Sequence, residues 1–287
     1  MNDIDLTSIL TRASTSSRGV AKPYLPESPV FASALLTTLP ATFGTGNIGR
    51  LGVNTVANRL LASGAEPRYL SATVTIDLDT PQEIIREVAL GMRDAAVEAE
   101  MEWTTVERSI LPVGPANGVS ISIFGVGCHM VNVTSRLDCV HPGDALILTG
   151  PVGATGAAVA GERRGIKVLT QSDGSVLTDV MRSIYAHLPD VPAVYYPFQG
   201  LRSALTSLGI NAEIDREKIP CNEAVREACE IMGLDPLNLA GADAMLLAVD
   251  RKDAERVLEA IRRYPAGECA AIIGYVRRTC HNGSSGA

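Results

Sequence analysis

Glycines that precede a helical pattern are the first residues whose spacing could serve chemistry, because such turns aim backbone amides at a bound anion. Gly44, Gly46 and Gly49 match the GxGxxG pattern of dinucleotide-binding folds. The match is weak, since Pro40 interrupts the approach and Glu66, the acidic residue at about the required distance, falls in a turn instead of a strand. We therefore interpret these glycines as a loop that enters a helix.

A second set, Gly150, Gly153 and Gly156, follows a short apolar strand pattern and opens a helix of small residues. Its backbone amides form a candidate anion-binding loop. This stretch lacks the Lys-Ser/Thr pair of a P-loop, and close packing of the helix on the strand would require the same glycines. The sequence leaves both interpretations open.

The six cysteines contain no CxxC pair, which is typical of buried thiols in a reducing compartment. Cys128 beside His129, and Cys139 near His141, carry metal-ligating side chains, but structural zinc sites use tighter paired spacing. No metal site is therefore predicted. The N-terminus lacks the basic stretch and apolar run of a signal peptide, so we expect a cytoplasmic protein.

The elements that must position such residues alternate along the chain. Apolar residues at helical spacing predict helices at 48–64, 81–100, 157–164, 174–187, 199–208, 221–232 and 251–263. Short β-branched or apolar runs predict strands at 69–78, 118–126, 130–134, 144–149, 211–214, 244–249 and 270–276. Mixed spacing of these elements favours an α+β protein over a single doubly wound sheet.

Two domains are expected from the length and from a connecting stretch near 135–142. The predicted organisation is a loose, polar arm at 1–30, an N-terminal domain at 31–137, a C-terminal domain at 138–280 and a flexible tail at 281–287.

The composition excludes two classes of partner. A net charge of −7 argues against general affinity for nucleic acid, which depends on Lys and Arg neutralising phosphates. No apolar run approaches the roughly 20 residues that span a bilayer, so no membrane association is expected. A small anionic ligand held by a local site is compatible with both observations.

Four blocks of the sequence resemble those of a known family. They are NIGRLGVNTVANRLLASGAEPRYLSATVTI, VHPGDALILTGPVGATGAAV, AEIDREKIPCNEAVREACEIMGLDPLNLA and AAIIGYV. Together they run in order from residue 44 to residue 276. They are similar to blocks of the hydrogenase maturation factor HypE family, within the AIR synthase (PurM-like) superfamily.

The resemblance implies a two-domain PurM-like fold. Its N-terminal domain has a mixed sheet that dimerises, and its C-terminal domain is an α/β sandwich that completes a cleft for Mg-ATP. The resemblance further implies a reaction in which ATP drives dehydration of a thiocarboxamide, carried on the family's C-terminal cysteine, to a thiocyanate.

The family's acidic positions are altered in this chain. Asn47 and Arg59 stand where the family has aspartates, although Asn58 is retained, and Glu107 is the only acid left in the stretch TVERSI. The family's RDPTRGG stretch reads YYPFQGL, and its terminal cysteine motif has no counterpart, since Cys280 lies in a different context. Mg²⁺ needs hard anionic oxygen ligands. The expected cofactors are therefore none, with ATP and Mg²⁺ as the alternative.

The replacements suggest a site of their own, in which Glu107 and Tyr196 act as acid or base. The substrate-binding residues of this hypothesis are Asn47, Asn58, Arg59 and Gln199. Arg59 would hold an anionic group. The alternative is that Arg59 and Glu107 merely pair across an empty cleft.

The leading expectation is a repurposed HypE-like homodimer that binds and transforms a small molecule without ATP, in a biosynthetic or accessory role. Two alternatives stay open. One is a non-catalytic partner protein of a maturation or biosynthetic enzyme. The other is an ATP-dependent carbamoyl dehydratase of the HypE type in hydrogenase maturation.

Overall fold

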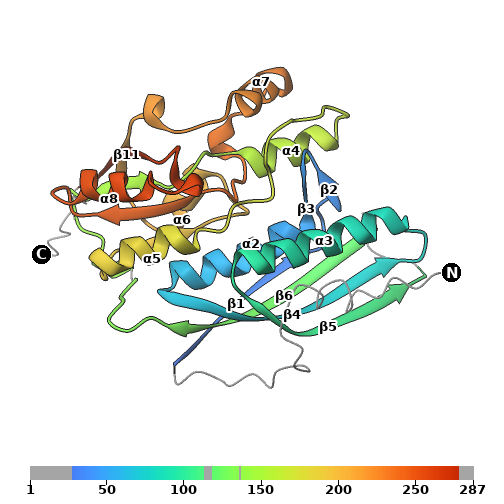
Figure 1. Cartoon of the computed structure of the whole chain (residues 1–287). Helices are drawn as coiled ribbons and strands as arrows, with labels where there is room; N and C mark the ends of the chain where they lie inside the picture. The colour runs from blue at the N-terminus through green and yellow to red at the C-terminus, as the bar shows by residue number, and fades with distance from the viewer. Residues whose placement is uncertain (1–27, 113–117, 136, 278–287) are drawn as a thin grey trace, which may run out of the picture.

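The computed structural model describes residues 28–112, 118–135 and 137–277. Two sheets, each with its own helices, lie one above the other in Figure 1, and the long helix α2 runs between them. The expected α+β fold is confirmed. The expected tail at 281–287 and most of the arm at 1–30 lie outside the described residues.

The N-terminal sheet has four strands in the order β1-β6-β4-β5. Their bounds are Pro29–Leu36, Val119–His129, Ala65–Asp77 and Glu102–Leu111 in that order. The β4–β5 pair is parallel and the other pairs are antiparallel. Helices α2 (Ile48–Ala62) and α3 (Gln82–Glu98) cover one face of this sheet, as Figure 1 shows.

A small hairpin leads into α2. It pairs β2 (Thr42–Phe43) with β3 (Gly46–Asn47), and Gly44 turns the chain at φ +58°. The side chain of Asn47 accepts from the amide of Arg50 and so caps the helix. The GxGxxG stretch is therefore a tight turn before a helix, which agrees with its interpretation as a loop.

The C-terminal sheet has five strands in the order β8-β10-β7-β11-β9, each antiparallel to its neighbours. Their bounds are Ala193–Tyr195, Met245–Val249, Ala145–Leu148, Ala271–Val276 and Ala212–Ile214 in that order. The helices are α4 (Ala154–Glu162), α5 (Thr178–His187), α6 (Leu201–Ser207), α7 (Glu223–Met232) and α8 (Ala254–Ile261). Short 3₁₀ turns lie at Leu137–Cys139, Arg216–Lys218, Pro236–Asn238 and Pro265–Gly267.

Some predicted elements differ from the observed ones. The strand expected at 118–126 is observed as β6, which runs on to His129, whereas the strand expected at 130–134 is wrong, because these residues form a turn and irregular chain. Strands β1, β5 and β8 had no prediction. β5 was missed because it lies at the sheet edge and most of its residues are exposed, so its apolar alternation is weak.

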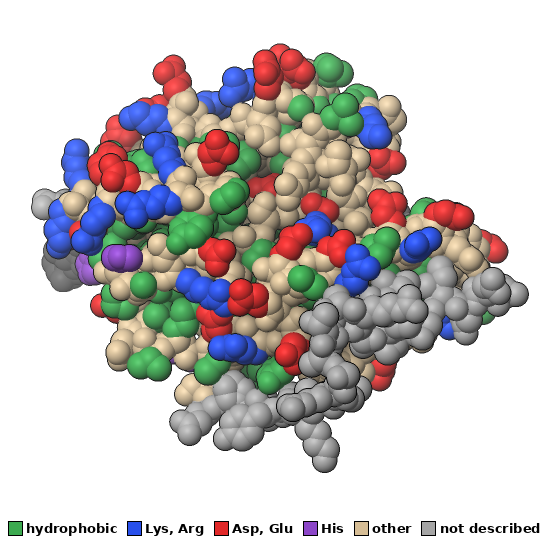
Figure 2. Space-filling model, viewed as in Figure 1, with side chains coloured by type: hydrophobic (Ala, Val, Ile, Leu, Met, Phe, Trp, Pro, Cys, Tyr) green, Lys and Arg blue, Asp and Glu red, His purple; other side chains and the backbone are tan. Residues whose placement is uncertain are grey.

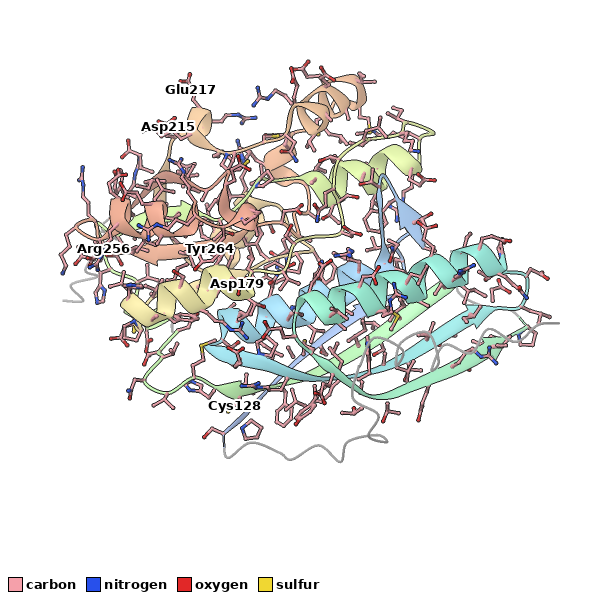
Figure 3. All side chains as sticks on the ribbon, in the orientation of Figure 1. Cys128, Asp179, Asp215, Glu217, Arg256 and Tyr264 are labelled. Carbon is pink, nitrogen blue, oxygen red and sulfur yellow. The ribbon has the colours of Figure 1, made fainter. Side chains whose placement is uncertain are left out.

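Helix α2 is the central element of the molecule because it is buried on nearly all sides. One side packs on β1, β4 and β6, while the other contacts β8 and α5 of the C-terminal domain. Arg182 of α5 also forms ion pairs with Glu66 and Glu100 of the N-terminal domain, the latter at 2.8 Å. Asp179, one turn earlier on α5, is labelled in Figure 3 and lies 3.6 Å from Arg182. These contacts fix the two domains against each other.

None of the helices in the described ranges is both long and apolar enough to cross a membrane. On the face drawn in Figure 2, acidic and basic side chains are interspersed over both domains.

Candidate functional site

Helix α2 carries a polar stripe on the side that faces the C-terminal domain. Asn47, Asn54, Thr55 and Asn58 fall within about 100° of one another around a helix that turns 100° per residue. All four are buried, and Asn54, Thr55 and Asn58 are 0% exposed. Because buried polar groups require partners, the segments opposite this stripe are expected to supply them.

The stripe is hydrogen-bonded to the segment before α5. The amide of Asn47 donates to Oδ2 of Asp173 at 3.2 Å. Nδ2 of Asn54 donates to the carbonyls of Asp173 and Gly174, at 3.2 and 2.7 Å. Nδ2 of Asn58 donates to Ser175 O at 2.9 Å, and its Oδ1 accepts from the amide of Leu177 at 3.0 Å. Two of the predicted substrate-binding residues, Asn47 and Asn58, thus join the domains.

Two carboxylates are buried at this domain junction. Burial raises the pKa of Asp173, although its hydrogen bond from Asn47 and the charge of Arg50, 4.0 Å away, oppose the shift. Burial, with a smaller contribution from the charge of Asp173, raises the pKa of Asp243 to about 7. Oδ2 of Asp243 has no hydrogen-bond partner among the described residues, and neither do Oδ1 of Asn54 and Oγ1 of Thr55.

Tyr195 connects the stripe to the chain around Ala242. Its hydroxyl donates to the carbonyl of Ala242 at 2.8 Å and lies beside Asn58 and Thr55 of α2. The amide of Ala242 in turn donates to Oγ1 of Thr155, in the first turn of α4, at 3.1 Å. The polar stripe and the start of α4 therefore belong to one hydrogen-bonded region.

Arg59 follows Asn58 on α2 and is half-buried. Its guanidinium donates to the carbonyl of Ser33 and lies over the ring of Phe198, 5.6 Å from the centroid. The described ion pairs give it no carboxylate partner. Burial lowers its pKa, because a desolvated guanidinium loses the hydration of its charge.

A pocket of about 300 Å³ opens between the domains beside Phe198. Its walls are the end of β1, the first turns of α4, Phe198 and Ala240. We call it the junction pocket. Its residues are Leu35, Leu36, Thr37, Thr38, Leu39, Thr155, Gly156, Val159, Phe198 and Ala240.

The three glycines of the predicted anion-binding loop lie in close packing. A Cβ atom on Gly150 would approach the carbonyl of Asp243 to 2.4 Å, and one on Gly156 would approach the amide of Ala240 to 2.7 Å. Gly153 precedes α4 at φ +79° and lies against Pro236. The amide of Gly156 already donates to Ala240 O. Packing therefore explains each glycine, and their role in anion binding stays a prediction.

The remaining predicted residues are Glu107, Tyr196 and Gln199. Glu107 is exposed on β5 and pairs with Thr73, on the face away from the helices and at the opposite edge of the sheet from β1. Within one chain, Glu107 therefore does not pair with Arg59. Tyr196 is buried in the C-terminal core, where burial raises its pKa and its hydroxyl has no described partner. Gln199 is exposed and accepts from Ser203 on α6.

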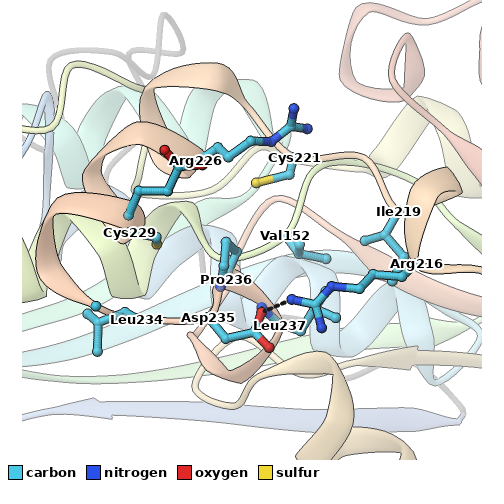
Figure 4. A pocket seen from close by; sticks show the side chains of 12 residues that line it. Val152, Arg216, Ile219, Cys221, Arg226, Cys229, Leu234, Asp235, Pro236 and Leu237 are labelled. Atoms are coloured by element: carbon cyan, nitrogen blue, oxygen red, sulfur yellow. Dashed lines mark hydrogen bonds and ion pairs between the residues drawn. The ribbon is translucent and has the colours of Figure 1, made fainter.

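A second pocket, of about 520 Å³, lies on the C-terminal domain between α7 and the 3₁₀ turns (Figure 4). Cys221, Cys229, Arg216 and Asp235 are among its lining residues, and Arg216 pairs with Asp235 at 2.9 Å. Burial raises the pKa of both thiols, that of Cys229 to about 11. Because the thiolate is the reactive form, this pocket offers no activated nucleophile.

The described residues do not fit a preformed magnesium site. They contain no group of three His, Cys, Asp or Glu side chains that could hold a metal ion. Of the two buried carboxylates at the junction, Asp173 is held by Asn47, and Asp243, whose pKa burial raises to about 7, is only partly ionised near neutral pH. Arg59 brings a positive charge to the same region, which repels a divalent cation.

Comparison with known proteins identifies the class. Residues 28–129 match the N-terminal domain of AIR synthase related proteins, and residues 200–285 match the C-terminal domain. The protein is thus a two-domain member of the AIR synthase related class. The carbamoyl dehydratase HypE of Rhizobium leguminosarum bv. viciae is 34% identical over 248 residues, which cover 83% of this chain and 70% of that protein. The chain belongs to the HypE family.

Solved structures agree with this assignment. The hydrogenase maturation protein HypE in complex with ATP superposes with a TM-score of 0.85 at 26% identity, covering 95% of this chain and 85% of that one. The structure of a HypE–HypF complex matches with a TM-score of 0.81 at 25% identity, covering 93% of this chain and 92% of that one.

The comparisons correct the leading functional expectation. A repurposed protein that works without ATP is contradicted by relatives named as carbamoyl dehydratases and by the neighbouring structure that contains ATP. These relatives are enzymes, and they favour the ATP-dependent alternative. The expectation gave too much weight to altered acidic positions and too little to the retained scaffold.

Sequence reasoning missed Asp173, Asp243 and Tyr195. Asp173 and Asp243 lie in loops, where an acidic residue is ordinarily solvated, and no spacing pattern marks them. The hydrogen-bond partners of Asp173 are more than 100 positions away in the sequence, so only the folded chain shows its burial. Tyr195 ends β8 and precedes the predicted Tyr196, and the two rings pack in different core clusters.

Proposed function

We propose that this protein is an ATP-dependent carbamoyl dehydratase of the HypE type that acts in hydrogenase maturation. One observation carries the proposal: relatives with that name are about one-third identical over more than four-fifths of the chain. The domain junction supports it, because a buried polar stripe, an arginine without a carboxylate partner among the described residues, and a pocket all lie there.

The reaction converts a carbamoyl group, –C(=O)NH₂, to a nitrile, –C≡N. The γ-phosphoryl group of ATP is transferred to the carbamoyl oxygen, and ADP leaves. The C–O bond then breaks, and inorganic phosphate departs with the oxygen. The nitrogen loses two protons as the C≡N bond forms. Phosphorylation is needed because hydroxide is a poor leaving group and phosphate is a good one.

The chain's own contribution is to bind the reactants and to enclose them away from water. The junction pocket excludes water on the sides formed by Leu36 and Val159, which protects a phosphorylated intermediate from hydrolysis. The hydrogen bonds of Asn54 and Asn58 hold the loop before α5 against α2, which fixes the C-terminal domain on the N-terminal one.

Phosphate release from ATP tests the proposal. The purified chain is incubated with ATP and a peptide that carries S-carbamoylcysteine, the thiocarboxamide chemistry of the family. We expect phosphate release that depends on the carbamoyl group and stops with a peptide carrying unmodified cysteine. Equal release with both peptides, or none with either, would refute the dehydratase assignment.

We also propose a homodimer formed through the N-terminal sheet. The face of this sheet away from α2 and α3 exposes Phe31, Leu35 and Phe124, and the rings of Phe31 and Phe124 stack at 5.6 Å. Phe31 is 56% exposed, and such an apolar area favours a partner. Glu107 lies on the same face, where a second copy would meet it.

The mass in solution tests the dimer. Light scattering should give twice the chain mass, and Phe124→Asp should give the monomer with unchanged helix content. Val131→Asp, a change at an exposed apolar residue outside the sheet, is the matched control and should stay dimeric. A monomeric wild-type protein would exclude this surface as a dimer interface.

A protein partner of the HypF kind is a further expectation, which co-purification with HypF from the same organism would test.

A further inference from the structure

We propose that Arg59, whose guanidinium lies over the pocket-lining Phe198, binds the phosphate groups of ATP directly and neutralises them in place of a divalent cation. The proposal rests on the proposed function, because ATP is the substrate whose phosphates are to be bound. It names the group that anchors them in this chain.

The first argument is the charge balance of the site. ATP is a polyanion, and an enclosed site must supply positive charge to hold it. Among the described residues no group of three metal-ligating side chains is present to hold a metal ion. Arg59 is a half-buried cation that lacks a carboxylate partner in the described ion pairs. A partly desolvated guanidinium that lacks a carboxylate partner gains from an anionic ligand, which supplies the opposite charge.

The second argument is position. The guanidinium of Arg59 lies 5.6 Å from the centroid of the Phe198 ring, and Phe198 also lines the junction pocket. Ser33, whose carbonyl accepts from Arg59, lies two positions before Leu35, which also lines the pocket. The guanidinium has five N–H donors, and the described bonds assign one nitrogen to Ser33. The remaining donors are suited to bidentate contacts with phosphate oxygens.

The third argument is the composition of the opposite wall. Thr155 and Gly156, in the first turn of α4, line the junction pocket, and this end of a helix attracts negative charge. Thr55 of α2 has a buried hydroxyl that makes no hydrogen bond among the described residues, and it lies beside Tyr195. The region therefore combines a cation, a helix end and an unused hydroxyl.

Nucleotide binding by calorimetry tests the proposal with a readout that does not require catalysis. ATP, ADP and AMP are titrated into the wild-type protein in EDTA and then in excess Mg²⁺. We expect ATP to bind in EDTA, with affinity falling from ATP to ADP to AMP. Magnesium should change the dissociation constant of ATP by less than about threefold, because the charge-assisted contact with Arg59 already neutralises the phosphates as Mg²⁺ would.

Substitutions at Arg59 assign the anchor. Arg59→Ala should weaken ATP binding about 10- to 100-fold and flatten the ATP, ADP and AMP series, as expected for loss of hydrogen bonds between charged groups. Arg59→Lys keeps the charge and loses the fork of donors, so its affinity for ATP should lie between those of the wild type and Arg59→Ala. Arg256→Ala is the matched control, because Arg256 is an exposed arginine on α8 paired with Asp253 at 2.9 Å. It should bind ATP like the wild type.

Each contrary outcome has a distinct meaning. ATP binding that requires Mg²⁺ overturns the inference and leaves the proposed function standing. Equal ATP affinity of wild type and folded Arg59→Ala in EDTA also overturns it. If a folded wild-type protein binds no ATP with or without Mg²⁺, the proposed function fails, and the inference fails with it.

Discussion

Asn47 and Asp173, which lie 126 positions apart, are joined by a hydrogen bond of 3.2 Å from the backbone amide of Asn47 to Oδ2 of Asp173. Oδ1 of the same asparagine caps α2 by accepting from the amide of Arg50 at 3.0 Å. One residue therefore starts the central helix and fixes it to the other domain. The position of the junction pocket depends on such contacts, because its walls come from both domains.

Asn58 should be the most sensitive polar residue of the stripe. Asn58→Ala leaves Ser175 O and the amide of Leu177 without partners, so we expect a loss of about 2 to 3 kcal/mol in the free energy of unfolding. Urea unfolding monitored by circular dichroism measures it. Gln199→Ala, at an exposed residue, should change stability by no more than about 0.5 kcal/mol. Equal effects of the two variants would contradict the role of Asn58.

Asp243 should make stability fall as pH rises. Its pKa is raised to about 7 by burial in the folded protein, against about 3.9 in an unfolded chain. Between these values the folded state binds more protons, so this carboxyl destabilises the fold progressively as pH rises from about 4 to 7. Asp243→Asn removes the charge. The free energy of unfolding of this variant should exceed that of the wild type by about 2 to 4 kcal/mol at pH 8, but by little at pH 4.

Thermal and urea unfolding from pH 4 to pH 8 measure this difference. Asp79→Asn, at an exposed position, serves as the control and should follow the wild type at every pH. A constant gap between Asp243→Asn and the wild type across this range would show that Asp243 does not titrate there.

Arg182 should hold the domains together. Its guanidinium pairs with Glu66 and Glu100 of the N-terminal domain, and Glu66 is mostly buried. Arg182→Ala should lower the free energy of unfolding by about 1 to 2 kcal/mol, since these bonds are charge-assisted but partly solvated. A double-mutant cycle with Glu66→Gln should recover a coupling of about 1 kcal/mol. Additive effects of the two changes would exclude a direct interaction.

Gly150 should tolerate no side chain. A Cβ atom there would lie 2.4 Å from the carbonyl of Asp243, so Gly150→Ala should cost about 3 kcal/mol in the free energy of unfolding. Gly165 is the comparison, because it has a positive φ of +70° but nothing within 4 Å of a Cβ atom. Gly165→Ala should cost only the backbone strain, about 1 kcal/mol. A smaller cost at Gly150 than at Gly165 would contradict the packing explanation.

Much of the fold could be predicted from local patterns. The apolar spacing before Gly64 predicts a helix at 48–64, and α2 spans Ile48–Ala62. The run at 244–249 predicts a strand, and β10 spans Met245–Val249. These patterns succeed because periodic burial shapes both the sequence and the element.

The candidate site was predicted less completely. Asn47, Asn58 and Arg59 do face the domain junction. They were predicted as site residues from the resemblance to a known family, and not from the spacing of residue types. Glu107 lies elsewhere because a strand's edge position is set by sheet order, which the local sequence does not encode. Asp173 and Asp243 went unnoticed because their burial depends on contacts between domains.

The product of the reaction tests the central claim most directly. The chain is incubated with an S-carbamoylcysteine peptide and ATP, and the peptide is analysed by mass spectrometry. Our account predicts a peptide lighter by one water, with the infrared band of a nitrile, formed only when ATP is present. An unchanged peptide in the presence of ATP and a folded, ATP-binding protein would contradict the assignment as a carbamoyl dehydratase.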